Sequence, residues 1–151
     1  MAELKERLRA DLNTAMRARD QVRMRTLRMA LTSITNEEVA GAAARDLSDD
    51  EIVKVLTREA RKRREAAEAF SAAGRTDQAA AERAEGEVLA GYLPAQLSDD
   101  ELAALVDAAI AETGASGMAS MGQVMKTVTP RVAGRADGAR VAAEVRRRLS
   151  G

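Results

Sequence analysis

The sequence predicts an all-α protein, with an N-terminal four-helix domain followed by a small three-helix domain. Apolar residues recur at intervals of three and four along almost every segment, which is the period of an amphipathic helix and not of a strand. The stretch 91–98 holds the single tyrosine and one of the two prolines, and it separates two helical parts. We therefore expect domains at residues 1–92 and 98–151, joined by a hinge at residues 93–97.

The first two helices are predicted from stripes of apolar residues. A helix over about residues 3–18 follows from a stripe with a spacing of four: Leu4, Leu8, Leu12 and Met16. Asp20 is the expected N-cap of the second helix, because its carboxylate can accept a hydrogen bond from a first-turn amide. The inward residues of that helix are expected to be Met24, Leu27, Leu31 and Ile34.

A longer third helix is expected to start after Ser48, because Ser48 and Glu51 have the spacing of a capping box. The helix ends near Gly74, and its inward stripe is Ile52, Leu56, Ala60, Ala67 and Phe70. Thr76 is the expected N-cap of a fourth, alanine-rich helix, with Ala81, Ala84 and Val88 inward. The short connections favour an antiparallel bundle.

The hinge is predicted from its turn residues. Pro94 has no backbone N–H and disfavours a helical conformation at the preceding residue. Ser98 and Glu101 form a second capping box, which starts the fifth helix. We expect Tyr92 to be a packing residue that fixes how the two domains meet.

Three helices are expected after the hinge. The fifth carries the stripe Leu102, Leu105, Val106, Ala109 and Ile110, and it ends at Gly114. Ser120 and Gln123 suggest a capping box for the sixth, which has Met121, Val124, Met125 and Val128 inward and Pro130 in its last turn. Gly134 is a candidate C-terminal glycine, and Asp137 is a candidate N-cap next to Gly138, before a last helix with Val141, Ala142, Val145 and Leu149 inward.

Composition excludes several classes of chemistry. The 151 residues include no histidine and no cysteine, so the common general base, thiol nucleophiles and the usual zinc ligands are absent. We therefore expect no catalytic residues, no metal and no cofactor. The N-terminus is charged and does not resemble a signal peptide, and no apolar run is long enough to span a membrane. We therefore expect a cytoplasmic protein without membrane contact.

Formal net charge is zero, with 24 basic and 24 acidic residues, so a nucleic-acid surface requires cations segregated onto one face. The third helix has one candidate cluster, which includes Arg58, Arg61, Lys62 and Arg64. Two interpretations are open for it: a phosphate-binding stripe, or a solvated face with i,i+4 ion pairs to Glu65 and Glu68.

A second cluster surrounds the turn between the last two helices: Lys126, Arg131, Arg135 and Arg140. Cations beside the free amides of a helix N-terminus can hold a phosphate. In the alternative, Asp137 occupies those amides as a cap and the arginines are solvated.

Several short motifs occur in an order that resembles the YqeY (GatB/YqeY-like) family. They are Glu59-Ala60, 62–65, Phe70 and 73–75 in the first part, then 92–94 with 96–98, Met121-Gly122 with 124–126, and 134–138. The resemblance covers essentially the whole chain. Residues 98–151 are similar to the tail domain of the B subunit of the tRNA-dependent amidotransferase, an α-helical appendage that helps to hold tRNA.

This resemblance implies a translation-related, non-catalytic helical module. Its expected partner is tRNA, or an enzyme of tRNA aminoacylation or amidation. A glutamine-dependent carbon–nitrogen ligase label would be inherited from the larger assembly, because the catalytic machinery lies outside the tail. The alternative function is a protein–protein adaptor without direct nucleic-acid contact.

Overall fold

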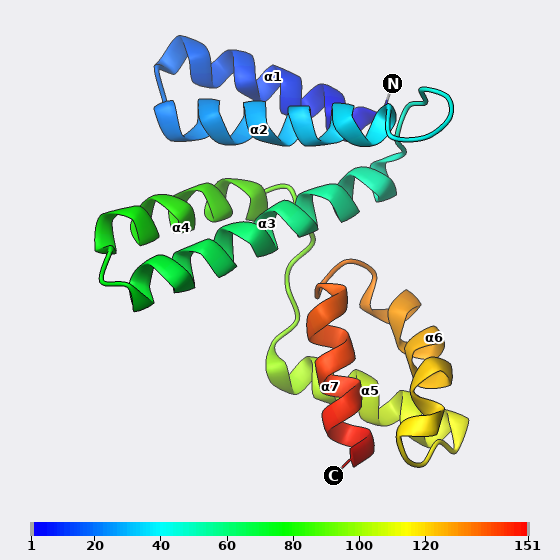
Figure 1. Cartoon of the computed structure of the whole chain (residues 1–151). Helices are drawn as coiled ribbons and strands as arrows, with labels where there is room; N and C mark the ends of the chain where they lie inside the picture. Colours follow the sequence, from blue (N-terminus) through cyan, green and yellow to red (C-terminus); the bar gives the residue numbers. More distant parts are fainter. Residues whose placement is uncertain (1, 151) are drawn as a thin grey trace. The chain divides into compact units, whose positions relative to one another are not determined.

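The computed structural model describes residues 2–150, and within that range it is all-α, without strands (Figure 1). It divides into two compact units, the first ending at Leu93 and the second beginning at Pro94. Of the described helices, none combines the length and the apolar character needed to cross a membrane.

The first unit contains two helical hairpins. Helices α1 (Glu3–Ala18) and α2 (Gln21–Glu38) pack side by side, as do α3 (Asp49–Ala72) and α4 (Thr76–Ala90) (Figure 1). Their shared core is built from aliphatic residues and one tyrosine: Leu8, Leu27, Ile34, Ile52, Leu56, Leu89 and Tyr92. The core lies where the two hairpins meet, and few residues are buried toward the α3–α4 connection.

The second unit is a three-helix arrangement in which each long helix contacts the other two. It consists of α5 (Asp99–Thr113), the 3-10 helix η1 (Met118–Ser120), α6 (Met121–Val132) and α7 (Gly138–Ser150). Branched aliphatic residues form most of its core: Leu102, Val106, Val124, Val128, Val132, Val141 and Val145. Leu97, which precedes α5, also belongs to this core.

Local caps explain why most helix starts were predictable. The side chains of Ser48 and Ser98 accept from the amides of Glu51 and Glu101, and both capping boxes are complete. Asp20 caps α2 by accepting from the Arg23 amide. Hydrogen bonds with the backbone amide and the side chain of Ser98 hold the pKa of Glu101 below its ordinary value.

Two predicted caps are wrong. Thr76 lies inside α4, whose N-cap is Arg75, and no side chain caps that end. Ser120 also makes no capping bond, because its hydroxyl donates to the Ser116 carbonyl within the turn that forms η1.

The predicted core positions need corrections in two helices. Met16 is exposed, and the neighbouring Ala15 is buried in its place. In α4, Ala81 is exposed, whereas Ala79 and Leu89 are buried. An alanine-rich sequence has little contrast between its faces, so the packing partner decides which alanines turn inward.

The predicted hinge is split between the two units, because the first unit ends at Leu93 and the second begins at Pro94. Tyr92 is buried in the first unit, where its hydroxyl donates to Asp11 at 2.5 Å. Beyond Pro94, the Gln96 side chain donates to the Pro94 carbonyl at 3.0 Å, and the Leu97 amide donates to the Arg135 carbonyl at 2.8 Å. The segment before α5 is therefore fastened to the α6–α7 turn of the second unit.

Candidate nucleic-acid interface

The turn between α6 and α7 is built around two left-handed residues. Ala133 has φ 50° and Gly134 has φ 80°, and glycine adopts the second value without steric cost. The turn ends at Asp137, whose carboxylate accepts from the Arg140 amide at 2.9 Å, so it caps α7, which begins with Gly138. The structure thus contains the Asp137 cap that one of the two interpretations of this turn expects.

The four cations predicted around this turn have different surroundings. Arg131 forms an ion pair with Glu112, and Arg140 contacts Asp99 at 2.9 Å. Arg135 turns back onto α6 and donates to the carbonyls of Arg131 and Val132, at 3.1 and 3.3 Å. Among the described residues, Lys126 has no ion-pair partner, and its side chain is exposed.

The neutral charge of the second unit conceals a segregation between its helices. All charged residues of α5 are acidic: Asp99, Asp100, Glu101, Asp107 and Glu112. The segment from η1 to the end of α7 has seven cations against two acids, Asp137 and Glu144; the cations are Lys126, Arg131, Arg135, Arg140, Arg146, Arg147 and Arg148. The basic charge is thus concentrated on α6, the following turn and α7.

Some of this basic charge is compensated by acids. Arg148 contacts Asp107 of α5 at 3.4 Å and also Glu144 at 3.0 Å. Arg147 donates to Glu144 at 2.6 Å, and hydrogen bonds from Arg147 and Arg148 lower the pKa of Glu144. Arg146 is exposed and has no ion pair among the described residues. Arg146 is not among the residues predicted from the sequence for the interface, because cations at the end of a helix are also favoured there by the helix dipole.

The cluster predicted on the third helix lies on α3, in the first unit, and is largely paired with acids. Arg58 contacts Glu37 at 3.3 Å, and Lys62 contacts the nearly buried Glu59 at 3.3 Å. Arg61 lies 3.9 Å from Glu65, as the i,i+4 spacing predicted. Arg64 also interacts with another group of the protein.

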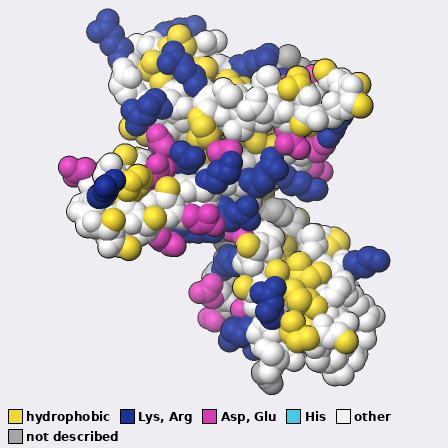
Figure 2. Space-filling view, viewed as in Figure 1, with side chains coloured by type: hydrophobic (Ala, Val, Ile, Leu, Met, Phe, Trp, Pro, Cys, Tyr) yellow, Lys and Arg dark blue, Asp and Glu magenta, His cyan; other side chains and the backbone are white. Residues whose placement is uncertain are grey.

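Arg63, which belongs to the same cluster, links α3 to α4. It lies 3.5 Å from both Glu82 and Glu85 of α4. Together with the pairs of Arg58 and Lys62, this contact favours the interpretation of the α3 cluster as an ion-paired helix surface. Figure 2 shows acidic and basic side chains interspersed over the first unit.

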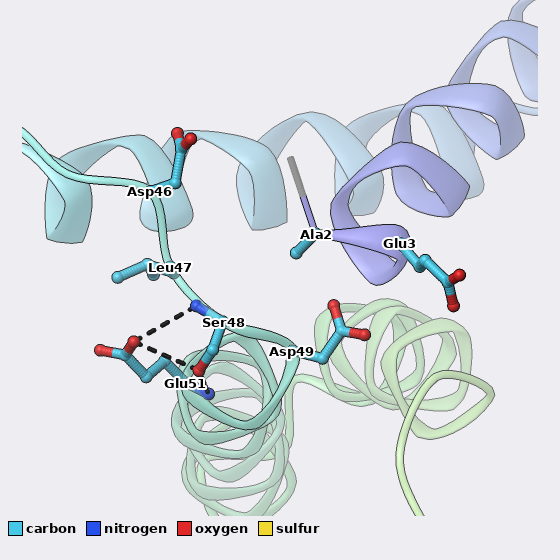
Figure 3. A pocket seen from close by; sticks show the side chains of 7 residues that line it. All are labelled: Ala2, Glu3, Asp46, Leu47, Ser48, Asp49 and Glu51. Carbon is cyan, nitrogen blue, oxygen red and sulfur yellow. Dashed lines mark hydrogen bonds between the residues drawn. The ribbon is translucent and has the colours of Figure 1, made fainter.

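An open depression of about 550 Å³ lies beside the N-termini of α1 and α3 (Figure 3). Two of its acidic side chains, Glu51 and Asp49, already bind groups at the helix ends. Glu51 accepts from Arg45 and Ser48, which lowers its pKa to about 2, and Asp49 accepts from the Leu4 amide at 3.1 Å. In the part of the chain that the structure describes, no group of three or more acids is placed to hold a metal ion. The depression is therefore explained as a junction of helix ends.

The chain matches a family model described as "Yqey-like protein" over residues 5–149. A search of curated proteins found no matching sequence. The matched region includes every described helix except the first residues of α1 and the last residue of α7.

Proposed function

The chain belongs to the YqeY-like family, and on that basis we propose that it is a non-catalytic, cytoplasmic helical module that binds tRNA or a tRNA-handling enzyme. The observation that carries this proposal is the concentration of cations on α6, the α6–α7 turn and α7. The similarity of residues 98–151 to a tRNA-holding tail domain supports the same conclusion. Binding relies on phosphate contacts, because the two aromatic residues of the chain, Phe70 and Tyr92, both lie outside this unit.

The ion pairs of the second unit are compatible with phosphate binding. The side chains of Arg131 and Glu112 are 38% and 56% exposed, and Asp99, the partner of Arg140, is 99% exposed. Exposed pairs of this kind contribute only about 0–1 kcal/mol. A phosphate can therefore bind these arginines at a small cost in free energy. Lys126 and Arg146 have no ion pair among the described residues, so they can bind a phosphate without breaking one.

The test is a titration of labelled bulk tRNA with the purified chain. Lys126→Glu/Arg146→Glu reverses two exposed cations of the second unit and breaks no ion pair. We expect it to weaken binding and to lower the salt dependence of log K by about 0.9 for each duplex phosphate that the variant no longer neutralises. Arg131→Glu/Arg135→Glu tests the turn in the same way.

A matched control comes from the first unit. Arg17 and Arg28 are exposed and have no ion pair among the described residues, so Arg17→Glu/Arg28→Glu makes the same change of net charge elsewhere. Binding that is weakened equally by this control would remove the assignment to the second unit. Absence of any tRNA binding by the wild-type chain would remove the direct-tRNA form of the proposal.

The second candidate function is a protein–protein adaptor. It is favoured by the α3 cations, which are mostly paired with acids of α2, α3 and α4 and so leave no free basic stripe there. A pull-down with and without nuclease separates the two functions. Partners that survive nuclease indicate an adaptor, and partners that disappear with the RNA indicate nucleic-acid binding.

A further inference from the structure

An apolar surface is exposed between α6 and α7 of the second unit, where Figure 2 shows hydrophobic side chains gathered. We define this α6–α7 apolar face by five residues: Met118, Met121, Met125, Ala142 and Leu149. Met118 is 44% exposed, and the other four are half-buried at the edge of the core. It combines contributions from η1, α6 and α7.

Helical periodicity places the residues of each helix on one side of that helix. Arg140 and Arg148 of α7 pair with acids of α5, so that side of α7 faces α5. Ala142 and Leu149 are seven residues apart, and they lie together on the other side of the helix. On α6, Met121 and Met125 are spaced by one turn, and η1, which includes Met118, packs against both α6 and α7.

The face has properties suited to holding another helix. Methionine has three rotatable bonds and a polarisable sulfur, and methionine-rich surfaces adapt to different apolar partners. A stripe of aliphatic residues at helical spacing is the complement that such a surface accepts. RNA offers no such aliphatic surface, and no aromatic ring of this unit is available for stacking.

The charges around the face indicate that the partner helix carries acidic residues. Neither η1 nor α6 contains Asp or Glu, and Glu144, the one acid of α7, is already bound by Arg147 and Arg148. Arg146 follows Ala142 by one turn on the same side of α7 and has no ion pair among the described residues. Lys126 extends the positive charge round α6.

We propose that the α6–α7 apolar face binds an amphipathic helix of a partner protein, whose aliphatic stripe contacts the methionines and whose acidic flanks face Arg146 and Lys126. This site shares Lys126 and Arg146 with the proposed tRNA interface, whereas its apolar contacts belong to the helix site alone, so variants of the apolar side chains test it separately. The acidic flanks select the partner and its orientation, since electrostatic complementarity contributes mainly specificity and association rate.

The experiment uses the whole chain and a fluorescent model helix of about five turns. The peptide has leucines at alternating intervals of three and four and glutamates at most other positions. A second peptide replaces the glutamates by lysines, and a third has the acidic composition in scrambled order. Binding is measured by fluorescence anisotropy at moderate salt, with circular dichroism of every protein variant to establish that it is folded.

Two exposed methionines provide a matched pair of variants. Met118→Glu places a charge in the face, whereas Met16→Glu changes an equally exposed methionine, 45% accessible, in the first unit. We expect Met118→Glu to weaken binding of the acidic helix by about tenfold or more, the effect of removing one buried apolar side chain. Met118→Gln, without the charge, should weaken it less, and Met16→Glu should leave it unchanged.

Several results would overturn the proposal. Equal binding of the lysine or scrambled peptide would show that charge or amphipathic order plays no part, and equal weakening by Met118→Glu and Met16→Glu would place the site elsewhere. A concentration-dependent dimer abolished by Met118→Glu would assign the face to a second copy of this chain. The tRNA affinity of Met118→Gln, which keeps every cation, should equal that of the wild type, so failure of either proposal is seen separately.

Discussion

The buried ion pair between Lys5 and Glu38 leads to a large predicted effect on stability. Lys5 Nζ donates to both carboxylate oxygens of Glu38, at 2.8 and 2.9 Å, and the two side chains are only 7% and 11% exposed. Lys5→Met leaves this carboxylate buried without its counter-charge, which should lower the free energy of unfolding by about 3–5 kcal/mol. Lys5→Met/Glu38→Gln should recover most of this stability, since the glutamine oxygen can still accept from the Leu47 amide.

Urea unfolding, monitored by tyrosine fluorescence, measures this effect in the first unit. Tyr92 is the single tyrosine of a chain without tryptophan, and it is buried in the core of the unit that contains the ion pair. Arg58→Met is the control, because it breaks the exposed pair with Glu37, the neighbour of Glu38 on α2. Exposed pairs contribute only about 0–1 kcal/mol. A cost of Lys5→Met no larger than that of Arg58→Met would refute the reasoning.

The same pair predicts a pH dependence. The hydrogen bond from Lys5 lowers the pKa of Glu38 from its ordinary value of 4.5. Because the folded pKa lies below the unfolded one, the stabilisation is complete above the unfolded pKa and is lost as pH falls through the folded pKa. The stability gap between wild type and Lys5→Met should therefore be widest near neutral pH and should narrow in acid. A gap that stays constant in acid would contradict the assignment.

Two further predictions concern a tyrosine and a helix cap. Burial and the bond to Asp11 raise the pKa of Tyr92 to about 12, so ultraviolet absorbance should show no tyrosinate near pH 10 while the protein stays folded; a midpoint near 10 would contradict this. Tyr92→Phe should lower the thermal stability of the first unit by about 1–3 kcal/mol, because it leaves the carboxylate of Asp11 without this donor. Ser98→Ala should cost about 1 kcal/mol in the second unit, and Ser120→Ala, which removes no capping bond, should cost much less; equal costs would refute the difference between these two helix starts.

The helices could be predicted because their signals are local. Ser48 with Glu51 and Ser98 with Glu101 each contain, within four residues, the donors and acceptors that start a helix. Ser120 with Gln123 has the same spacing but fails, because a 3-10 turn precedes α6 and takes the serine hydroxyl. Capping sequences therefore identify where a helix can start, and the preceding backbone decides whether the side chain is used.

Interactions between distant residues could not be predicted in this way. Lys5 and Glu38 are 33 residues apart, and nothing near either one indicates that it is buried. The cations of the second unit were found from their positions along the sequence, but their acidic partners on α5 depend on how the helices pack. The pairs of Arg131 with Glu112 and of Arg140 with Asp99 therefore became visible only in the structure.

The salt dependence of tRNA binding tests the central claim most directly. Wild-type protein is titrated into labelled tRNA at several salt concentrations, beside Lys126→Glu/Arg146→Glu and the first-unit control Arg17→Glu/Arg28→Glu. The proposed interface predicts that log K falls linearly with log salt, and that only the Lys126/Arg146 variant flattens the slope, by about 0.9 for each duplex phosphate it no longer neutralises. Equal slopes for all three proteins would contradict an interface on α6 and α7.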